Sequence, residues 1–321
     1  MGWALDTVVE LDCHLAGFAG SYLRSSDERR QVVAAYMAVK LIGGGAAATR
    51  DTAGFLTRAD HRTILQSAFG DVPRGLRGAL RRSGSQPHEI GFYAALNELL
   101  SSPPHAGIVR SIEVLTEINP LKLSVARKLP AEVCVANVID AVKSVKAAED
   151  TAKVIELLIA NGVDRSALFG AVRSVGSSRD LSELWRRWTR RTVFDRHPVP
   201  ASPAYSPVRS GGELRRLARR YRNCAEHYIP TVLDGFDHFA QFESDGQACV
   251  VHMKRREGVW YLEDLFAKHN ARPHPALRAA ATAYLREHGV LPWPSTKAET
   301  GEWAVLHRLS SSGHYDFEED D

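Results

Sequence analysis

Residues 236–266 read FDHFAQFESDGQACVVHMKRREGVWYLEDLF. Three apolar segments, 236–242, 248–254 and 259–266, are separated by polar turns that each contain a glycine. Short apolar segments joined in this way are typical of antiparallel strands, because glycine tolerates the positive φ of tight hairpins. The stretch therefore predicts a three-stranded antiparallel meander.

Helical patterns lie on both sides of this meander. Residues 213–233 carry Leu214, Leu217 and Tyr221 at helical spacing, and residues 275–288 form an Ala-rich segment that ends at Gly289. The predicted order in this part of the chain is therefore α-β-β-β-α.

The same region resembles the PcfJ-like family. The resemblance rests on Leu214-x-x-Leu217, Asn223-Cys224-x-x-x-Tyr228, Gly235, the apolar strand at 248–252, Trp260 and His269-Asn270-x-x-Pro273. It implies an association with conjugative plasmids, phages and other mobile genetic elements, and it covers about residues 214–289. The family usually has Gln and Gly before the Asn and His before the Cys, where this chain has Asp264, Ala267 and Asn223. A ligand site at those positions would therefore be altered here.

The first 194 residues carry apolar side chains at helical spacing, interrupted by Gly, Pro and capping residues. Expected helices include 26–45, 57–69, 86–101, 130–145, with Pro130 at its first position, and 147–160. We expect an irregular α-helical bundle or weak solenoid whose surface docks a protein partner. With the meander, the predicted fold class is α+β.

Residues 179–191 predict an amphipathic helix with Leu181, Leu184, Trp185 and Trp188 along one side and arginines mainly on the other. The tryptophans could stack on nucleic-acid bases, or they could be core residues behind an exposed arginine face. We favour core tryptophans. The proline-rich segment that follows predicts a linker at 195–212 between a helical domain (1–194) and an α+β domain (213–310). An acidic tail (311–321), expected to be disordered, follows the second domain.

Positive charge is concentrated around this linker. Residues 182–222 contain eleven Arg and no Lys against three acidic residues. Guanidinium groups pair well with phosphate oxygens, but a chain with 32 Arg and nine Lys could equally present an ordinary solvated face. If the arginines form one continuous outward strip, the expected nucleic-acid contacts are Arg186, Arg187, Arg190, Arg191, Arg215, Arg216, Arg219, Arg220 and Arg222.

Polar residues that could act on a substrate gather in the α+β domain. His252 and His269 could exchange protons with help from Asp264, as in metal-independent RNA cleavage. A pocket is expected around Asn223, Cys224, His227 and Asn270. His227 could assist a Cys224 thiolate, but a small buried cysteine with His227 at its rim is the commoner arrangement, and we favour it.

Zinc is a weaker hypothesis. Cys224-x-x-His227 and Cys249-x-x-His252 together supply the ligand types of a structural zinc site. Residues three apart in a strand point to opposite faces, so Cys249 and His252 should not converge on one ion. We therefore expect no metal and no cofactor.

Composition limits the remaining possibilities. Hydrophobic residues make up 44% and charged residues 25%, as in ordinary globular proteins, and four scattered cysteines do not form a disulfide framework. Neither a signal peptide nor a run of about 18 apolar residues is evident. We expect a cytoplasmic accessory protein of a mobile-element or phage-related system that binds nucleic acid, DNA or RNA, or a nucleoprotein. The alternatives are a nuclease-like effector and a non-catalytic protein-binding scaffold.

Overall fold

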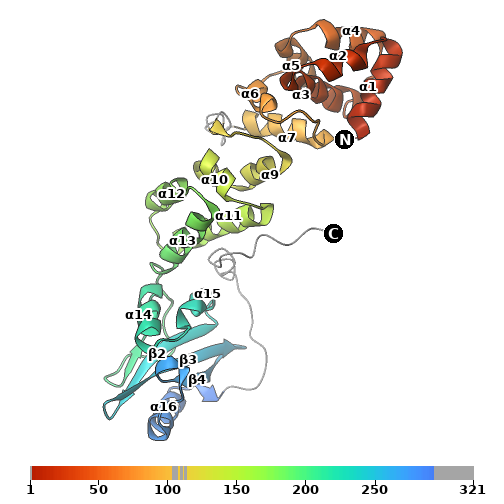
Figure 1. Ribbon diagram of the computed structural model, residues 1–321. Helices are drawn as coiled ribbons and strands as arrows, with labels where there is room; N and C mark the ends of the chain where they lie inside the picture. The colour runs from red at the N-terminus through yellow and green to blue at the C-terminus, as the bar shows by residue number, and fades with distance from the viewer. Residues whose placement is uncertain (1, 103–107, 109–110, 112–113, 293–321) are drawn as a thin grey trace. The chain divides into compact units, whose positions relative to one another are not determined.

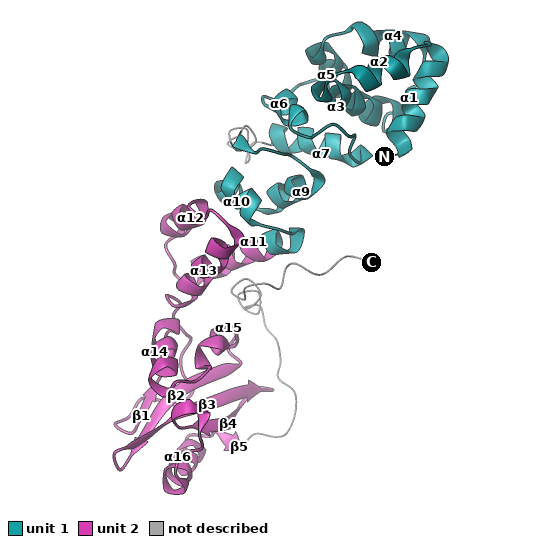
Figure 2. Ribbon diagram, in the orientation of Figure 1, with its two compact units in different colours: residues 1–149 teal, residues 150–321 magenta. Residues whose placement is uncertain are grey.

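The computed structural model describes residues 2–102, 108, 111 and 114–292. It divides into two compact units, Met1–Glu149 and Asp150–Asp321, which are coloured separately in Figure 2. The division falls inside helix α11 (Val145–Ala160), whereas the sequence pattern placed a linker at 195–212. The expected acidic tail at 311–321 lies outside the described residues.

The predicted linker is part of unit 2 for a physical reason. Val199 and Tyr205 are fully buried in its apolar core, and strand β1 (Tyr205–Pro207) pairs with the sheet. Phe194 N donates to the carbonyl of Arg209, so the segment leaves the neighbouring helices and returns to them. The proline-rich segment is therefore an ordered part of unit 2 and not a flexible linker.

The regular elements of unit 1 are all helices over its described residues, as the sequence predicted. Its elements are α1 (Gly2–His14), α2 (Phe18–Arg24), α3 (Asp27–Tyr36), the π-helix η1 (Met37–Ile42), α4 (Arg50–Arg58), α5 (His61–Phe69), α6 (Leu76–Arg81), α7 (Ile90–Ser101), α9 (Pro120–Lys128), the 3-10 helix η3 (Ala131–Val133) and α10 (Ala136–Ala141). No helix in the described part of the chain is long and apolar enough to cross a membrane.

Two predicted helices in unit 1 are interrupted. The pattern at 57–69 breaks at Asp60, whose side chain accepts from Thr63 N and begins α5. The pattern at 130–145 forms only η3 and α10, and Pro130 caps η3 instead of opening an α-helix. Side-chain capping by Asp60 therefore accounts for the first interruption, whereas no side chain caps η3 or α10.

Unit 2 continues with helices on either side of a five-stranded sheet (Figure 1). Its remaining elements are α12 (Arg165–Arg173), α13 (Ser178–Thr189), α14 (Gly211–Tyr221), the 3-10 helix η4 (Ala225–Tyr228), α15 (Ile229–Leu233), β2 (Asp237–Ser244), β3 (Gln247–Arg256), β4 (Val259–Phe266), the 3-10 turn η5 (Lys268–Asn270), α16 (Pro275–Glu287) and β5 (Leu291–Pro292). The predicted α+β class is confirmed, and the order α-β-β-β-α is extended by β1 and β5.

The meander forms as its turns predicted. β2, β3 and β4 pair antiparallel in sequence order, with β1 beside β2 and β5 parallel to β4. Both central residues of each hairpin have positive φ: 51° and 70° at Asp245 and Gly246, and 51° and 83° at Glu257 and Gly258. These values are those of type I′ turns, whose twist matches that of the flanking strands.

The sheet separates two apolar layers. α14 and α15 cover one face, where Leu214, Leu217 and Ile229 pack against Phe239 and Val250. α16 covers the other face (Figure 1), where its buried residues pack against β2, β3 and β4. A side chain on a central strand is therefore enclosed on whichever face it points to.

The single helix predicted at 213–233 is broken. α14 ends at Arg222, which adopts a left-handed conformation with φ 50°, and the chain continues as η4 and α15. Pro230 lies at the start of α15, where its lack of an N–H is tolerated. Cys224 and His227 consequently do not lie on a continuous α-helix.

Candidate nucleic-acid interface

α13 is strongly amphipathic. Ser177 caps it by accepting from Asp180 N, and Leu184, Trp185 and Trp188 are buried along its inner side. The core position predicted for both tryptophans is confirmed, so neither indole is available to stack on a base. The arginines of its outer side and of its carboxyl end are Arg186, Arg187, Arg190 and Arg191, and all except the half-buried Arg190 are exposed.

α14 presents a second group of arginines. Its inner side buries Leu214, Leu217, Ala218 and Tyr221. The outer residues Arg216, Arg219, Arg220 and Arg222 are exposed, and Arg215 is half-buried. The alternation follows from helical spacing, because the apolar positions recur every three or four residues.

A carboxylate joins the two groups. Oε1 of Glu226 lies 3.2 Å from Nε of Arg190 and 3.4 Å from Nε of Arg215. Two of the nine predicted contact arginines are therefore tied to Glu226, and Nη2 of a third, Arg216, lies 4.0 Å from Oε1 of Glu213. The expected continuous strip is interrupted at Arg190 and Arg215. The exposed arginines are three from the first group, Arg186, Arg187 and Arg191, and four from the second, Arg216, Arg219, Arg220 and Arg222.

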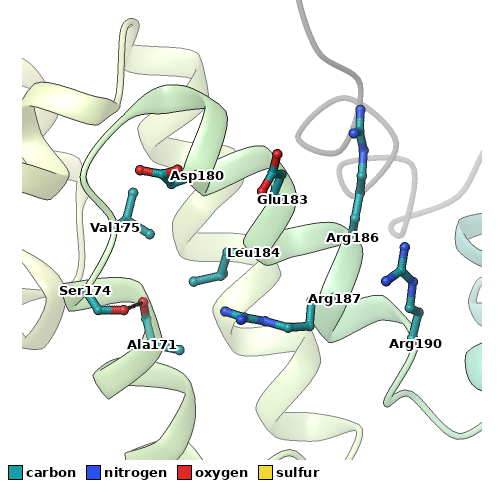
Figure 3. Close-up of a pocket in the computed structure, with 9 residues that line it drawn as sticks. All are labelled: Ala171, Ser174, Val175, Asp180, Glu183, Leu184, Arg186, Arg187 and Arg190. Carbon is teal, nitrogen blue, oxygen red and sulfur yellow. Dashed lines mark hydrogen bonds between the residues drawn. The ribbon is translucent and has the colours of Figure 1, made fainter.

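A cleft of about 490 Å³ lies between α12 and α13. Figure 3 shows Arg187 reaching toward Ser174 at the carboxyl end of α12, where the helix dipole favours a cation. Asp180 and Glu183, from the amino-terminal half of α13, line the same cleft. Its mixed charge makes it less suitable for a polyanion than the outer face of α14.

His252, one of the predicted catalytic residues, is enclosed in the core. Its ring stacks on Phe239 with centroids 4.4 Å apart and planes at 8°, and it lies edge-on to Tyr228 at 4.8 Å. Its Nε2 lies 2.7 Å from Oδ1 of Asp237, and both side chains are only 3% exposed. A substrate would not reach this imidazole in the structure.

The other two predicted catalytic residues do not form a site with His252. Asp264 is the register partner of His252 across β3 and β4, beside a bulge at His252/Met253. Its Oδ1, however, lies 3.7 Å from Nη1 of Arg278 on α16 and accepts from Leu265 N. His269 is exposed in η5 with φ 60°. The three residues therefore lack the mutual geometry of an acid–base site.

The expected pocket residues lie at the surface. Cys224, His227 and Asn270 are exposed, and the side-chain oxygen of the half-buried Asn223 accepts from Ala225 N. The buried position favoured for Cys224 is thus wrong, because α14 ends before it. η5 and α14 are neighbours, which places Asn270 near the arginine-bearing helix.

Cys249 and His252 lie on opposite faces of the sheet, as their spacing in a strand predicted. Cys249 packs in the layer beneath α16, whereas His252 stacks on Phe239 in the opposite layer. Over the residues that the structure describes, no group of three or more His, Cys, Asp or Glu side chains could hold a metal ion.

Two further histidines, the half-buried His197 and the buried His238, were not predicted as a pair. Their rings lie edge to face with centroids 4.9 Å apart. Burial lowers the pKa of His238 to about 3, with a further contribution from His197, and burial lowers the pKa of His197 itself to about 4. Both rings are therefore neutral near pH 7.

The strand register also shows that Asp237 is the diagonal cross-strand neighbour of His252. The turn length between β2 and β3 could have indicated this pairing from the sequence.

Comparisons with known proteins add no relative. The chain matches no family model, no curated protein and no solved structure.

Proposed function

We propose that this protein binds nucleic acid through the outer face of α14, with support from the arginines of α13. The observation that carries the proposal is the exposure of Arg216, Arg219, Arg220 and Arg222 on a helix whose opposite side is buried. Among the described residues, Arg219 and Arg222 have no carboxylate partner. Phosphate oxygens are natural partners for such guanidinium groups, since each contact also releases condensed counterions.

The Glu226 bridge has a place in this proposal. Arg190 and Arg215 hold the carboxylate between α13 and α14, so they position the two helices rather than contact phosphate themselves. This leaves the exposed arginines of α14 as the main contacts. An ordinary solvated face is the competing explanation, and the salt dependence below separates the two.

The proposal extends to the rest of the chain. Unit 1 would dock a protein partner, since Leu5 and Val9 lie one turn apart on α1 with 55% and 59% exposure. The setting would be a cytoplasmic, mobile-element or phage-related system, as the resemblance of the α+β region to the PcfJ-like family implies. A nuclease is not proposed, because His252 is enclosed in the core whereas His269 is exposed in η5.

The test is a fluorescence-anisotropy titration of the full chain with labelled DNA and RNA of one sequence, between about 50 and 200 mM salt. Affinity should fall steeply with salt. The variant R216A/R219A/R220A/R222A should bind weakly, and its log–log salt slope should be shallower by about one unit for each phosphate that it no longer neutralises.

The matched control is R278A/R286A, which removes two arginines from α16 on the other face of the sheet. It should keep most of the affinity and the original slope. A flat salt response of the unmodified protein, or an equal loss of affinity in both variants, would remove the proposal.

A further inference from the structure

A second cavity, of about 480 Å³, lies beside α14 over strands β1 and β2. Three of its lining side chains are arginines: Arg216 and Arg220, one turn apart on α14, and Arg209, which precedes the helix. All three are exposed, so their guanidinium groups are accessible to a ligand. Val208 and Leu217 add an apolar wall.

The polar groups of this cavity are oriented by the fold. Oε1 of Gln241 on β2 accepts from Nη1 of Arg220 at 3.0 Å. Oε2 of Glu213 accepts from Arg209 N at 2.7 Å, and Ser210 caps α14 by accepting from Glu213 N. The backbone around Arg209 is thus held in place at the mouth of the cavity.

The balance of charge in the cavity favours a dianion. Glu213 is the one carboxylate among its described lining residues, and its Oε1 lies 4.0 Å from Nη2 of Arg216. Three guanidinium groups and one carboxylate leave a net charge of +2. A phosphate inside a nucleic-acid strand carries one negative charge, whereas a phosphate monoester carries close to two at pH 7.

We propose that this cavity binds a phosphate monoester, with Arg209, Arg216 and Arg220 as its ligands and Val208 and Leu217 against the attached organic group. The cavity volume is that of a small-molecule site, larger than an inorganic ion needs. Two sources share this chemistry: the terminal phosphate of a nucleic-acid strand and a free nucleoside monophosphate. The first rests on the proposed function, because Arg219 and Arg222 would then hold interior phosphates.

The experiment compares one short single-stranded oligonucleotide in three forms: with a 5′-phosphate, with a 3′-phosphate and with hydroxyl ends. Binding to the full chain is measured by anisotropy, and adenosine monophosphate is titrated separately by calorimetry. One of the phosphorylated forms should bind roughly tenfold tighter than the hydroxyl form, an effect comparable to one charge-assisted hydrogen bond.

R216A/R220A should abolish this preference, and R216K/R220K should weaken it, because lysine keeps the charge but lacks the planar fork. The control R219A/R222A, on the same helix but outside the cavity, should lower affinity for all three forms equally and keep the preference. The lysine variant also guards against a loss that reflects only misfolding.

The outcomes separate the two proposals. If the three oligonucleotides bind equally and adenosine monophosphate does not bind, the cavity proposal is overturned while nucleic-acid binding stands. If no oligonucleotide binds but adenosine monophosphate does, in a manner that requires Arg216 and Arg220, the cavity takes a free nucleotide and the proposed function fails. If nothing binds, both are overturned.

Discussion

Nε2 of His252 lies 2.7 Å from Oδ1 of Asp237, and both side chains are buried between the sheet and the α14 layer. The imidazole also stacks on Phe239. A polar pair enclosed in this way stabilises a fold only while both partners remain, because either one alone would be a desolvated group without a hydrogen bond.

Replacement of His252 should therefore destabilise unit 2. We expect H252A to lower the free energy of unfolding by about 3–5 kcal/mol, since it leaves the Asp237 carboxylate buried and unpaired. Urea denaturation followed by far-UV circular dichroism measures this loss. H269A, at an exposed histidine, is the control and should change stability by no more than about 0.5 kcal/mol. Equal effects of the two substitutions would contradict the role of the pair.

Acid should weaken unit 2 through His197 and His238. Their pKa values in the folded protein are about 4 and about 3, below the value of about 6.5 expected in an unfolded chain. Between these limits the unfolded chain binds protons that the folded chain does not, so stability falls as the pH falls, by up to ~1.4 kcal/mol per pH unit for each histidine.

Urea midpoints at about pH 7.5 and about pH 5 test this expectation. H238Q should reduce the difference between the two midpoints, whereas H227Q, at an exposed position, should leave it unchanged. An unmodified protein whose midpoint does not move between these pH values would rule out the neutral histidine pair.

Gly211 permits the close approach of α14 to the end of α13. A Cβ added there would lie 2.2 Å from the carbonyl oxygen of Thr189 and 3.1 Å from Cα of Arg190. G211A should therefore cost about 1–3 kcal/mol, the usual range for overpacking. G170A, in α12, meets nothing within 4 Å and should be neutral or stabilising by up to ~1 kcal/mol. Thermal melts of both variants measure these changes in stability. A melting temperature of G211A equal to that of the unmodified protein would contradict the need for close contact between the two helices.

Cysteine reactivity should follow burial. Cys13 and Cys224 are exposed, whereas burial raises the pKa of Cys134 to about 12 and that of Cys249 to about 11. Since the thiolate is the reactive form, brief alkylation of the native protein should label the first two and spare the others. Mass spectrometry of peptides locates the label, and alkylation in urea, which should reach all four, is the control. Rapid native labelling of Cys249 would contradict its enclosed position.

Local sequence patterns were sufficient to predict much of the secondary structure of unit 2. The glycine-containing turns at Asp245-Gly246 and Glu257-Gly258 specify tight hairpins, so the meander could be predicted from the chain alone. The inward side of α13 could be predicted for the same kind of reason, because Trp185 and Trp188 share one helical face. Such features depend on residues that are near neighbours along the chain.

The candidate sites depended on features that helical and strand spacing do not indicate. Helical spacing runs through 213–233, yet Arg222 ends α14 in a left-handed conformation, and Cys224 is exposed as a result. Asp264 lies opposite His252 beside a bulge in the β3–β4 pair, yet its carboxylate is near Arg278 of α16, and apolar spacing indicates neither feature.

The sequence by itself determined the α+β class, the meander and the concentration of arginine around residues 182–222, because periodicity, turn chemistry and composition are local properties. Only the tertiary structure decided which arginines remain exposed and which are held by Glu226, and where His252 finds its partner. The reason is that burial and charge pairing arise between elements that the chain brings together only when it folds.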